Sequence, residues 1–471
     1  MISFILNNQT VVTNQPSGST VLDFVRYHKR LSGTKIGCRE GDCGACTILV
    51  GDREDGKLIY RSMTSCLMPL GNAQGKHIVT VEGINMADLS PVQQAMVDTN
   101  GTQCGFCTIG FVMSLTGFVM NETAKNYQQA IASIDGNICR CTGYKSIERA
   151  AEMLSEKMNE KPGETTMDWL ISNNFIPAYF NDIANRLQQL KTTAENINDE
   201  NGTLIIGGGT DLIVQKHSLV KRSATNHVFD TASLKGVRFE NEKYIIGAST
   251  TVTDFAESIL IQNNFPDLAK HIKLVSSTPI RNMATIAGNI VNASPIGDMT
   301  VFFLALNAEI TLSNHATKRS VLLKDFYKGY KQLDKTKDEF IESISFSLPS
   351  AAVFNFEKVC KRTHLDIASV NSACMFQLNN DGTIEDVHLA AGGVAPFPKY
   401  LFNTVAFLKN KKISAATLKE GIKIMNEEIA PISDARGTAD YKRLLLRQLF
   451  LAHFAGINKN VLKEILLQPA F

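Results

Sequence analysis

The stretch KIGCREGDCGACTILV, residues 35–50, places three cysteines within nine residues of a glycine-rich segment. Cys38, Cys43 and Cys46 follow the spacing C-x4-C-x2-C, and Cys66 comes after nineteen further residues. Thiolates are ligands for zinc and for iron–sulfur centres, and a supple loop lets several of them converge on one point. The stretch therefore predicts a metal centre that organises the first domain of the chain.

The spacing of this first cysteine group is the plant-type ferredoxin arrangement, in which four thiolates hold a 2Fe–2S cluster. Gly37, Gly41 and Gly44 can adopt positive φ, so backbone amides can approach the cluster and tune its potential. The alternative is a zinc site built on C-x2-C, but zinc ribbons repeat that pair and give the x4 member no role. We expect Cys38, Cys43, Cys46 and Cys66 to be cluster ligands.

The flanking sequence predicts a small β-grasp domain over residues 1–85. Residues 2–13 alternate around Asn7-Asn8 and predict a hairpin, and residues 46–52 predict a strand leaving the loop. Residues 20–30 have helical periodicity. The order strand, strand, helix, loop and strand is that of a ferredoxin domain.

A second cysteine group lies in helical surroundings over residues 86–157. Cys104 and Cys107 form C-x2-C, and Cys139 and Cys141 form C-x-C. Four helices are predicted, at residues 90–101 (Ser90 as N-cap and Pro91 at the first helical position), 107–121, 127–137 and 146–158. The C-x-C pair must sit on a tight turn facing the C-x2-C pair across this bundle, because neighbours two apart on a strand lie nearly 7 Å apart. Zinc remains an alternative for this group by itself, and a second 2Fe–2S cluster is the interpretation we prefer after a ferredoxin domain.

The motifs CREGDCGACTIL, QCGFCTIGFVMS and GNICRCTGY together resemble the two-cluster N-terminal region of the molybdenum hydroxylases, the family of xanthine dehydrogenases and aldehyde oxidoreductases. The resemblance covers approximately residues 1–157. One departure is Ile109, where the family pattern has proline; it touches no expected ligand.

Composition agrees with a cytoplasmic protein of several domains. The 471 residues carry a net charge of +2, which gives no reason to expect nucleic acid or a membrane surface as a partner. The first residues lack a secretory signal, and the apolar run at 109–120 is too short to span a bilayer. Eight of the ten cysteines lie between Cys38 and Cys141. In a reducing compartment such crowding favours metal ligation over disulfides.

A polar linker is predicted at residues 158–177, around Pro162-Gly163, and the composition changes after it. GTLIIGGGTDLIVQK, residues 202–216, is a short strand running into three glycines whose bare backbone could present N–H groups to a diphosphate. The spacing does not fit a G-x-G-x-x-G dinucleotide fold, and no helix of that kind is expected after it. A structural turn explains the glycines equally well.

Residues 279–299, PIRNMATIAGNIVNASPIGDM, favour a diphosphate site over a structural turn at the three glycines. With the glycine run upstream they resemble the vanillyl-alcohol-oxidase-type FAD-binding domain of the same family, here over residues 178–350. The family motif often has Gly-Gly-Asn where this chain has Ala287-Gly288-Asn289, and a proline-containing run where this chain has MTVFF. By motif, the resemblance implies FAD contacts from Gly207, Gly208, Gly209, Thr210, Asp211, Thr285, Gly288, Asn289, Ser294 and Asp298, the last on the ribityl or ribose hydroxyls.

Residues 351–471 predict strands and turns, then helices from about residue 414, and resemble the C-terminal domain of these flavoproteins. The expected fold class is therefore multidomain α+β: a β-grasp ferredoxin domain, a four-helix 2Fe–2S domain, the FAD-binding domain and a C-terminal α+β flavoprotein domain.

The resemblance implies an electron-transfer role with no catalytic acid or base in this chain. Members oxidise a heterocycle or an aldehyde at a molybdopterin centre, which needs several hundred residues beyond these 471. We therefore expect the small iron–sulfur and FAD subunit of a split enzyme, as in bacterial xanthine dehydrogenase, with a molybdopterin-binding large subunit in a heterodimer or a dimer of heterodimers. Electrons would pass through both clusters to FAD and then to NAD.

Three alternatives stay open at this point. The chain could serve an aldehyde or another N-heterocycle hydroxylase, it could be a stand-alone NADH-dependent iron–sulfur flavoprotein reductase, or it could be a non-enzymatic iron–sulfur scaffold or sensor. A second cluster would be idle in the reductase, and the flavin motifs argue against the scaffold.

Overall fold

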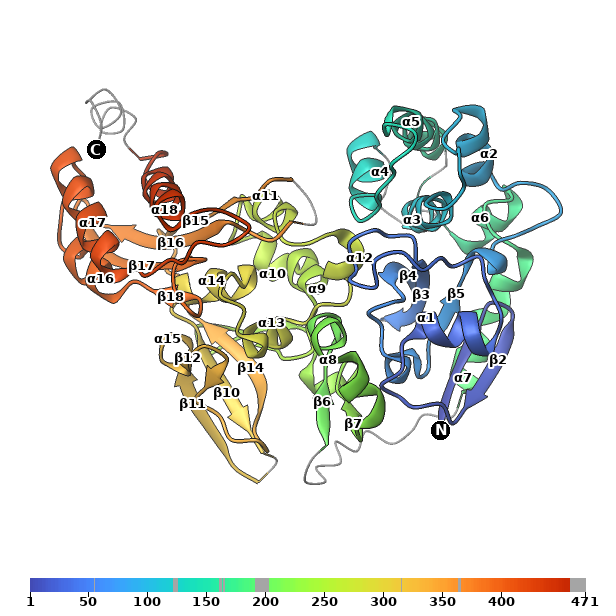
Figure 1. Cartoon of the computed structure of the whole chain (residues 1–471), viewed down its shortest axis with the longest axis horizontal. Helices are drawn as coiled ribbons and strands as arrows, with labels where there is room; N and C mark the ends of the chain where they lie inside the picture. Colours follow the sequence, from blue (N-terminus) through green and yellow to red (C-terminus); the bar gives the residue numbers. More distant parts are fainter. Residues whose placement is uncertain are drawn as a thin grey trace. The chain divides into compact units, whose positions relative to one another are not determined.

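The computed structural model describes most of the chain, in two compact units (Figure 1). Unit 1 comprises Met1–Asp230 and Ser277–Ala284, and unit 2 comprises Thr231–Ser276 and Thr285–Phe471. The described residues are 1–54, 56–121, 126–160, 163, 166–190, 203–314, 316–362 and 366–457. Pro162 of the predicted linker lies outside them.

Unit 1 begins with a mixed five-stranded sheet of strand order β2-β1-β5-β3-β4. Its strands are β1 (Ile2–Leu6), β2 (Gln9–Thr13), β3 (Thr47–Glu54), β4 (Lys57–Thr64) and β5 (His77–Val79). The hairpin predicted at residues 2–13 is confirmed, with Leu6 paired to Gln9 across the turn. The helix predicted at 20–30 is α1 (Val21–Asp23), which continues as a wider π-helical turn over Phe24–His28. The β-grasp prediction is confirmed.

The four predicted helices follow as α2 (Pro91–Asp98), α3 (Thr108–Met120), α4 (Tyr127–Ser133) and α5 (Lys145–Asn159). Ser90 caps α2 with a full capping box that includes Gln93, as its sequence indicated. Helix α3 packs on β3 and β4, and its buried residues join α2, α4 and α5 in one hydrophobic core. This packing fixes the helical subdomain on the ferredoxin sheet.

The rest of unit 1 holds two differences from expectation. Helix α6 (Met167–Ser172) lies inside the segment predicted as a linker, where Trp169 stacks on buried Phe175. Further along, β6 (Leu204–Ile206) pairs in parallel with β7 (Thr225–His227), and α8 (Thr210–Arg222) connects them. The expectation that no such helix follows the three glycines is wrong, because the apolar residues Ile213 and Val220 of α8 find a core to pack on. Helix α7 (Ile183–Gln189) precedes this βαβ element.

Unit 2 contains a five-stranded antiparallel sheet of order β11-β10-β14-β9-β8. Its strands are β8 (Val237–Glu240), β9 (Lys243–Gly247), β10 (Glu309–Ser313), β11 (Lys318–Leu322) and β14 (Phe340–Phe346). A small hairpin is formed by β12 (Tyr327–Gly329) and β13 (Gln332–Leu333). Its helices are α9 (Val252–Glu257), α10 (Ile259–Gln262), α11 (Leu268–Lys273), α13 (Ile286–Asn292), α14 (Asp298–Ala305) and α15 (Leu323–Phe326). The segment between α11 and α13 carries α12 (Thr278–Arg281), which belongs to unit 1.

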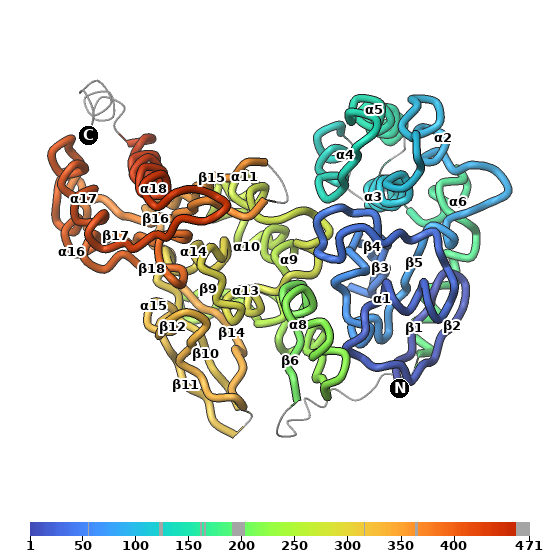
Figure 2. The backbone as a smooth tube through the Cα atoms, viewed as in Figure 1, coloured from blue at the N-terminus to red at the C-terminus, as the bar shows by residue number. Residues whose placement is uncertain are grey.

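A second sheet in unit 2, of order β15-β16-β17-β18, lies near the C-terminal helices, as the tube in Figure 2 also shows. Its strands are β15 (Val353–Val359), β16 (Val370–Leu378), β17 (Ile384–Gly392) and β18 (Lys399–Tyr400). The helices are α16 (Phe402–Leu408), α17 (Ala415–Glu428) and α18 (Ala439–His453), so helical structure starts before the predicted residue 414. Helix α14 also contacts β16 and β17. The expected α+β classes are thus present in both units.

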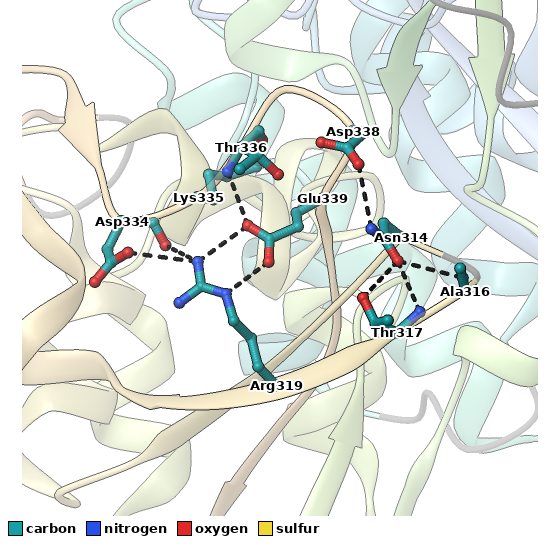
Figure 3. A network of polar contacts seen from close by, with 9 residues as sticks. All are labelled: Asn314, Ala316, Thr317, Arg319, Asp334, Lys335, Thr336, Asp338 and Glu339. Carbon is teal, nitrogen blue, oxygen red and sulfur yellow. Dashed lines mark hydrogen bonds and ion pairs between the residues drawn. The ribbon is translucent and has the colours of Figure 1, made fainter.

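An ion-pair network ties the edge of the first sheet of unit 2 together (Figure 3). Arg319 on β11 binds Glu339 through two nitrogens, at 2.6 and 3.0 Å. The backbone amide of Thr336 donates to the same carboxylate at 2.8 Å. Arg319 holds the pKa of Glu339 at about 2, so the carboxylate is charged at neutral pH.

No helix among the described residues is long and apolar enough to cross a membrane.

Candidate iron–sulfur and flavin sites

The first cysteine group lies on one loop and on the strand-end turn beside it. Cys46 and Cys66 are buried, whereas Cys38 and Cys43 are partly exposed. The amide of Cys38 points at the sulfur of Cys43 at 3.5 Å, and the amide of Glu40 points at the sulfur of Cys38 at 3.3 Å. Backbone N–H groups aimed at thiolate sulfurs are the arrangement that stabilises a charged cluster.

Gly41 and Gly44 of this loop meet the expectation of positive φ, whereas Gly37 does not. Gly41 has φ +81° and Gly44 has φ +68°. A Cβ on Gly44 would lie 2.3 Å from the carbonyl oxygen of Gly136, and a Cβ on Gly37 would lie 2.6 Å from the sulfur of Cys43. The loop can curl this tightly only because these side chains are missing.

The second cysteine group joins two loops of the helical subdomain. Cys104 and Cys107 lie between α2 and α3, and Cys139 and Cys141 lie between α4 and α5. The sulfurs of Cys104 and Cys141 are 3.7 Å apart. The C-x-C pair therefore sits on a turn and faces the C-x2-C pair, as its spacing predicted.

Two hydrogen bonds join the loops that carry the two cysteine groups. The amide of Ile138 donates to the carbonyl of Cys43 at 3.0 Å, and the Asn137 side chain donates to the carbonyl of Gly44 at 3.2 Å. Buried Ser114 on α3 donates to the Asn137 oxygen at 2.7 Å. The loop holding the first group is thus bonded directly to the residues that precede Cys139.

The eight thiols fall into four neighbouring pairs, and in one of them the sulfurs are within hydrogen-bond distance. The pairs are Cys38 with Cys43, Cys46 with Cys66, Cys104 with Cys141, and Cys107 with Cys139. Within the described residues, no three His, Cys, Asp or Glu side chains gather where one ion could bind them. A structural zinc needs four ligands around a single ion, whereas a 2Fe–2S cluster takes two ligands on each of its two irons. The two-by-two arrangement fits the binuclear cluster.

Proton sharing inside the pairs is visible in the thiol pKa values. The hydrogen bond from Cys43 lowers the pKa of Cys38 to about 5, and the same bond raises the pKa of Cys43. The Cys46–Cys66 bond likewise lowers the pKa of Cys46 and raises that of Cys66. In each of these two pairs one thiol therefore has a lowered pKa and its partner a raised one, and metal binding would require both protons to leave.

The glycine run lies at the start of α8 in unit 1. Gly209 has φ +79° and is the residue before Thr210, where the helix begins. A Cβ on Gly208 would lie 1.8 Å from the carbonyl oxygen of Met283, and the carbonyl of Gly207 accepts from Asn72 at 2.9 Å. The first turn of a helix leaves N–H groups without helical partners, which suits a diphosphate. Asp211 is exposed and accepts from Gln215 at 3.3 Å.

The second set of predicted FAD residues lies on α13, α14 and the turn between them, in unit 2. The Thr285 hydroxyl caps α13 by accepting from the Gly288 amide at 3.2 Å. Asn289 accepts from the amide and the hydroxyl of Thr300, each at 3.1 Å, and so binds α13 to α14. Ser294 begins the turn between the helices, its carbonyl accepting from the amide of Gly297. These residues thus form one compact segment with structural partners of its own.

Asp298 has two partners that the sequence did not indicate. Its carboxylate accepts from Lys358 at 2.8 Å and from Asn371 at 2.6 Å. Lys358 and Asn371 are both buried, and the Oδ1 atom of Asn371 has no hydrogen-bond partner. The buried Oδ1 atom of Asn371 is therefore a polar group without a partner, as expected beside a bound polar ligand such as FAD. A lysine and an asparagine on strands β15 and β16 gave no motif signal, and only the fold brings them to Asp298.

The predicted FAD residues therefore divide between the two units. Gly207 to Asp211 belong to unit 1, and Thr285 to Asp298 belong to unit 2. Their joint role in binding one cofactor stays a prediction.

Four family models match the chain in succession. They are the 2Fe-2S iron-sulfur cluster binding domain over residues 4–70, the 2Fe-2S binding domain over 80–152, the FAD binding domain in molybdopterin dehydrogenase over 179–350, and the CO dehydrogenase flavoprotein C-terminal domain over 356–456.

Curated relatives align along almost the whole chain. The xanthine dehydrogenase of Emericella nidulans is 30% identical over 89% of this chain and 36% of its own length, and that of Blastobotrys adeninivorans is 27% identical over 98% and 41%. Aldehyde oxidase 2 of Macaca fascicularis is 26% identical over 99% and 40%. The chain thus spans about two fifths of the length of these relatives.

Solved structures share the fold. A Cu,Mo-CO dehydrogenase chain, 24% identical, covers 53% of this chain and 87% of its own with a TM-score of 0.50. Quinoline 2-oxidoreductase from Pseudomonas putida 86, 22% identical, covers 55% and 90% with the same TM-score.

Proposed function

Because this chain belongs to the molybdenum hydroxylase family, in which it supplies the iron–sulfur and FAD domains, we propose that it is the electron-transfer part of a xanthine dehydrogenase-type oxidoreductase. The observation that carries the proposal is the pairing of its eight thiols two by two. Two binuclear clusters followed by a flavin domain suit a chain of one-electron carriers that ends at a two-electron carrier.

The residues that would hold each group are those named above. Cys38, Cys43, Cys46 and Cys66 would hold the ferredoxin-type cluster, and Cys104, Cys107, Cys139 and Cys141 the helical-domain cluster. The glycine run 207–209 and the α13–α14 segment would hold FAD. When bound, the clusters carry single electrons and FAD collects two for transfer to NAD.

The chain's own residues then have three tasks. They hold the two cysteine loops at a fixed separation, which the Ile138–Cys43 and Asn137–Gly44 hydrogen bonds support. They place backbone amides on the sulfurs of Cys38 and Cys43. They also bury Cys46 and Cys66 away from water. None of these tasks needs a general acid or base.

The partner we propose is a molybdopterin-binding large subunit that oxidises the substrate and feeds electrons to this chain. Support comes from the longer relatives, of which this chain covers 36–41%. A heterodimer or a dimer of heterodimers is the proposed assembly. The cytoplasm is the proposed compartment, since eight crowded cysteines that ligate metal suit a reducing environment.

Xanthine is the proposed substrate and NAD the proposed acceptor, because several of the curated relatives are xanthine dehydrogenases. An aldehyde or another N-heterocycle is the second candidate, favoured by the similarity to aldehyde oxidase 2. The substrate is read by the partner, so the two candidates differ in the partner's pocket and agree on the role of this chain.

The experiment is to purify the chain from its own cells under mild conditions and to assay what accompanies it. We expect a molybdenum-containing subunit in equal amount and xanthine-dependent reduction of NAD⁺. In the Cys104→Ser variant we expect that activity to be lost while NADH still reduces the bound FAD. A preparation with NADH-dependent reductase activity that binds no molybdenum-containing chain would favour the stand-alone reductase instead.

A further inference from the structure

A cavity of about 540 Å³ lies in unit 1 beside the first cysteine loop. Its walls come from the helical segment 21–28, from the cysteine loop and from helix α8. The charged and aromatic groups that line it include Asp23, Tyr27, His28, Arg39, His217 and Lys221. A cavity of this volume falls in the range that takes a small organic ligand.

The charged groups of the cavity are predominantly cationic. Arg39 pairs with Asp23 at 2.8 Å, which neutralises both. Lys221 is exposed and forms no ion pair with any residue in the described part of the chain. The Nε2 atom of His217 is buried and has no hydrogen-bond partner; it lies 3.8 Å from the Asp23 carboxylate. The wall therefore holds one unneutralised positive charge, on Lys221.

Helix α8 is distorted where it lines the cavity. Lys216 has φ −139° and ψ 32°, which interrupts the helix immediately before His217. Four residues later the backbone of Val220 presses on Gly18, where a Cβ would meet the Val220 carbonyl oxygen at 2.1 Å. A break inside a helix costs free energy and has an identifiable cause. Here it turns the segment carrying His217 and Lys221 against the ferredoxin domain.

One wall of the cavity is aromatic. His28 stacks on Phe24 with ring centroids 5.7 Å apart and an interplanar angle of 29°. Tyr27 is 62% exposed. Exposed aromatic faces stack on the ring of a flat ligand.

We propose that this cavity binds a planar organic anion of mononucleotide size, with its ring on the Tyr27 and His28 side and its phosphate or carboxylate at Lys221. The imidazole of His217 lines the cavity beside that charge. A dianion there also competes with Asp23 for the guanidinium of Arg39.

Arg39 lies between Cys38 and Cys43 in the chain, so a ligand bound in the cavity lies close to the cluster that those cysteines would hold. A negative charge placed against Arg39 disfavours an added electron on a cluster held by those cysteines, so it lowers the reduction potential. This second statement rests on the proposed function, whereas the binding itself does not. The cavity is then an effector site that adjusts electron flow to FAD.

Binding is tested with the full-length protein carrying its cofactors, by isothermal titration with adenosine 5′-monophosphate and with inorganic phosphate. We expect saturable binding of the nucleotide, at least about tenfold tighter than phosphate, because only the nucleotide fills the aromatic wall. Lys221→Ala should weaken nucleotide binding at least about tenfold through loss of a charged hydrogen bond. Arg222→Ala removes the same charge one residue away, outside the cavity lining, and should change the affinity less than twofold.

No saturable binding, equal affinity for phosphate, or equal losses in the two variants would each overturn the proposal. The effector role is tested in the same samples by EPR-monitored redox titration, in which the nucleotide should lower the potential of one cluster in the wild type but not in Lys221→Ala. An unchanged potential would overturn the effector role alone. Nucleotide binding by a protein that contains no iron would leave this site standing and refute the proposed function.

Discussion

Replacing Asp298 with alanine should destabilise unit 2 strongly, because the buried ammonium of Lys358 would lose its carboxylate partner. The Lys358 side chain is 2% exposed and lies 2.8 Å from Asp298, with the Leu274 carbonyl as its other partner. At an effective dielectric constant of about 20, a pair at this separation attracts by roughly 6 kcal/mol before desolvation. Breaking one side of such a buried pair costs about 3–5 kcal/mol. A unit of this size then melts about 6–20 °C lower.

A double-mutant cycle separates the ion pair from the predicted FAD contact. Lys358→Met removes the buried charge, so Asp298→Ala combined with Lys358→Met should be far more stable than the sum of the two single losses predicts. The assay is differential scanning calorimetry of the three variants and the wild type, with bound FAD measured in each sample. Strictly additive losses would show that Asp298 and Lys358 do not stabilise unit 2 as a pair. If the double variant is stable yet has lost FAD, Asp298 contacts the cofactor; if it retains FAD, Asp298 acts through Lys358.

Two further predictions use single positions. Arg319 lowers the pKa of Glu339 to about 2, so the stabilising contribution of Glu339 is complete above its ordinary pKa near 4.5 and is lost as the pH falls toward 2. The Glu339→Gln variant should therefore have a lower urea midpoint than the wild type at pH 7. This difference in midpoint should shrink by pH 3. Gly44→Ala should lower the iron content by about half or more, because its Cβ would lie 2.3 Å from the Gly136 carbonyl oxygen. The control variant Gly56→Ala should keep its iron, since Gly56 has a similar φ of +83° but no atom within 4 Å of the added Cβ. Equal losses in both variants would show that backbone strain, and not the contact with Gly136, decides cluster assembly.

The ferredoxin and helical subdomains could be predicted from sequence because their signals are local. The spacing of Cys38, Cys43 and Cys46 fixes a loop, and Ser90 with Pro91 fixes a helix start, whatever the rest of the chain does. Periodicity also located α3 and α5 to within a residue or two of their ends. The pairing of thiols across loops needed only that the C-x-C segment be a turn.

The flavin half was predicted less completely because its contacts are between distant segments. Residues 277–284 pack in unit 1, although the residues on both sides of them in sequence belong to unit 2. Arg281, for example, pairs at 2.9 Å with Asp135, a buried residue of the helical subdomain. No periodicity predicts such a partner. Likewise nothing near Lys358 in sequence points to Asp298.

Two glycines of the predicted FAD motifs also have structural roles that the sequence did not indicate. Gly208 was expected to admit a diphosphate, yet its missing Cβ is already required by the carbonyl of Met283. Gly288 was expected on the cofactor, yet a Cβ there would meet the Thr285 hydroxyl at 2.7 Å. A motif reports that a side chain is absent, and the fold supplies a structural reason for it in addition to any ligand.

In the proposed function, the eight paired thiols hold two binuclear iron centres. Its most direct test is iron, zinc and FAD analysis of the purified chain together with EPR after anaerobic reduction, on the wild type and on Cys141→Ser. We expect about four irons per FAD and two distinct signals, falling to about two irons and one signal in the variant. Zinc in place of iron, or loss of both signals in Cys141→Ser, would contradict it.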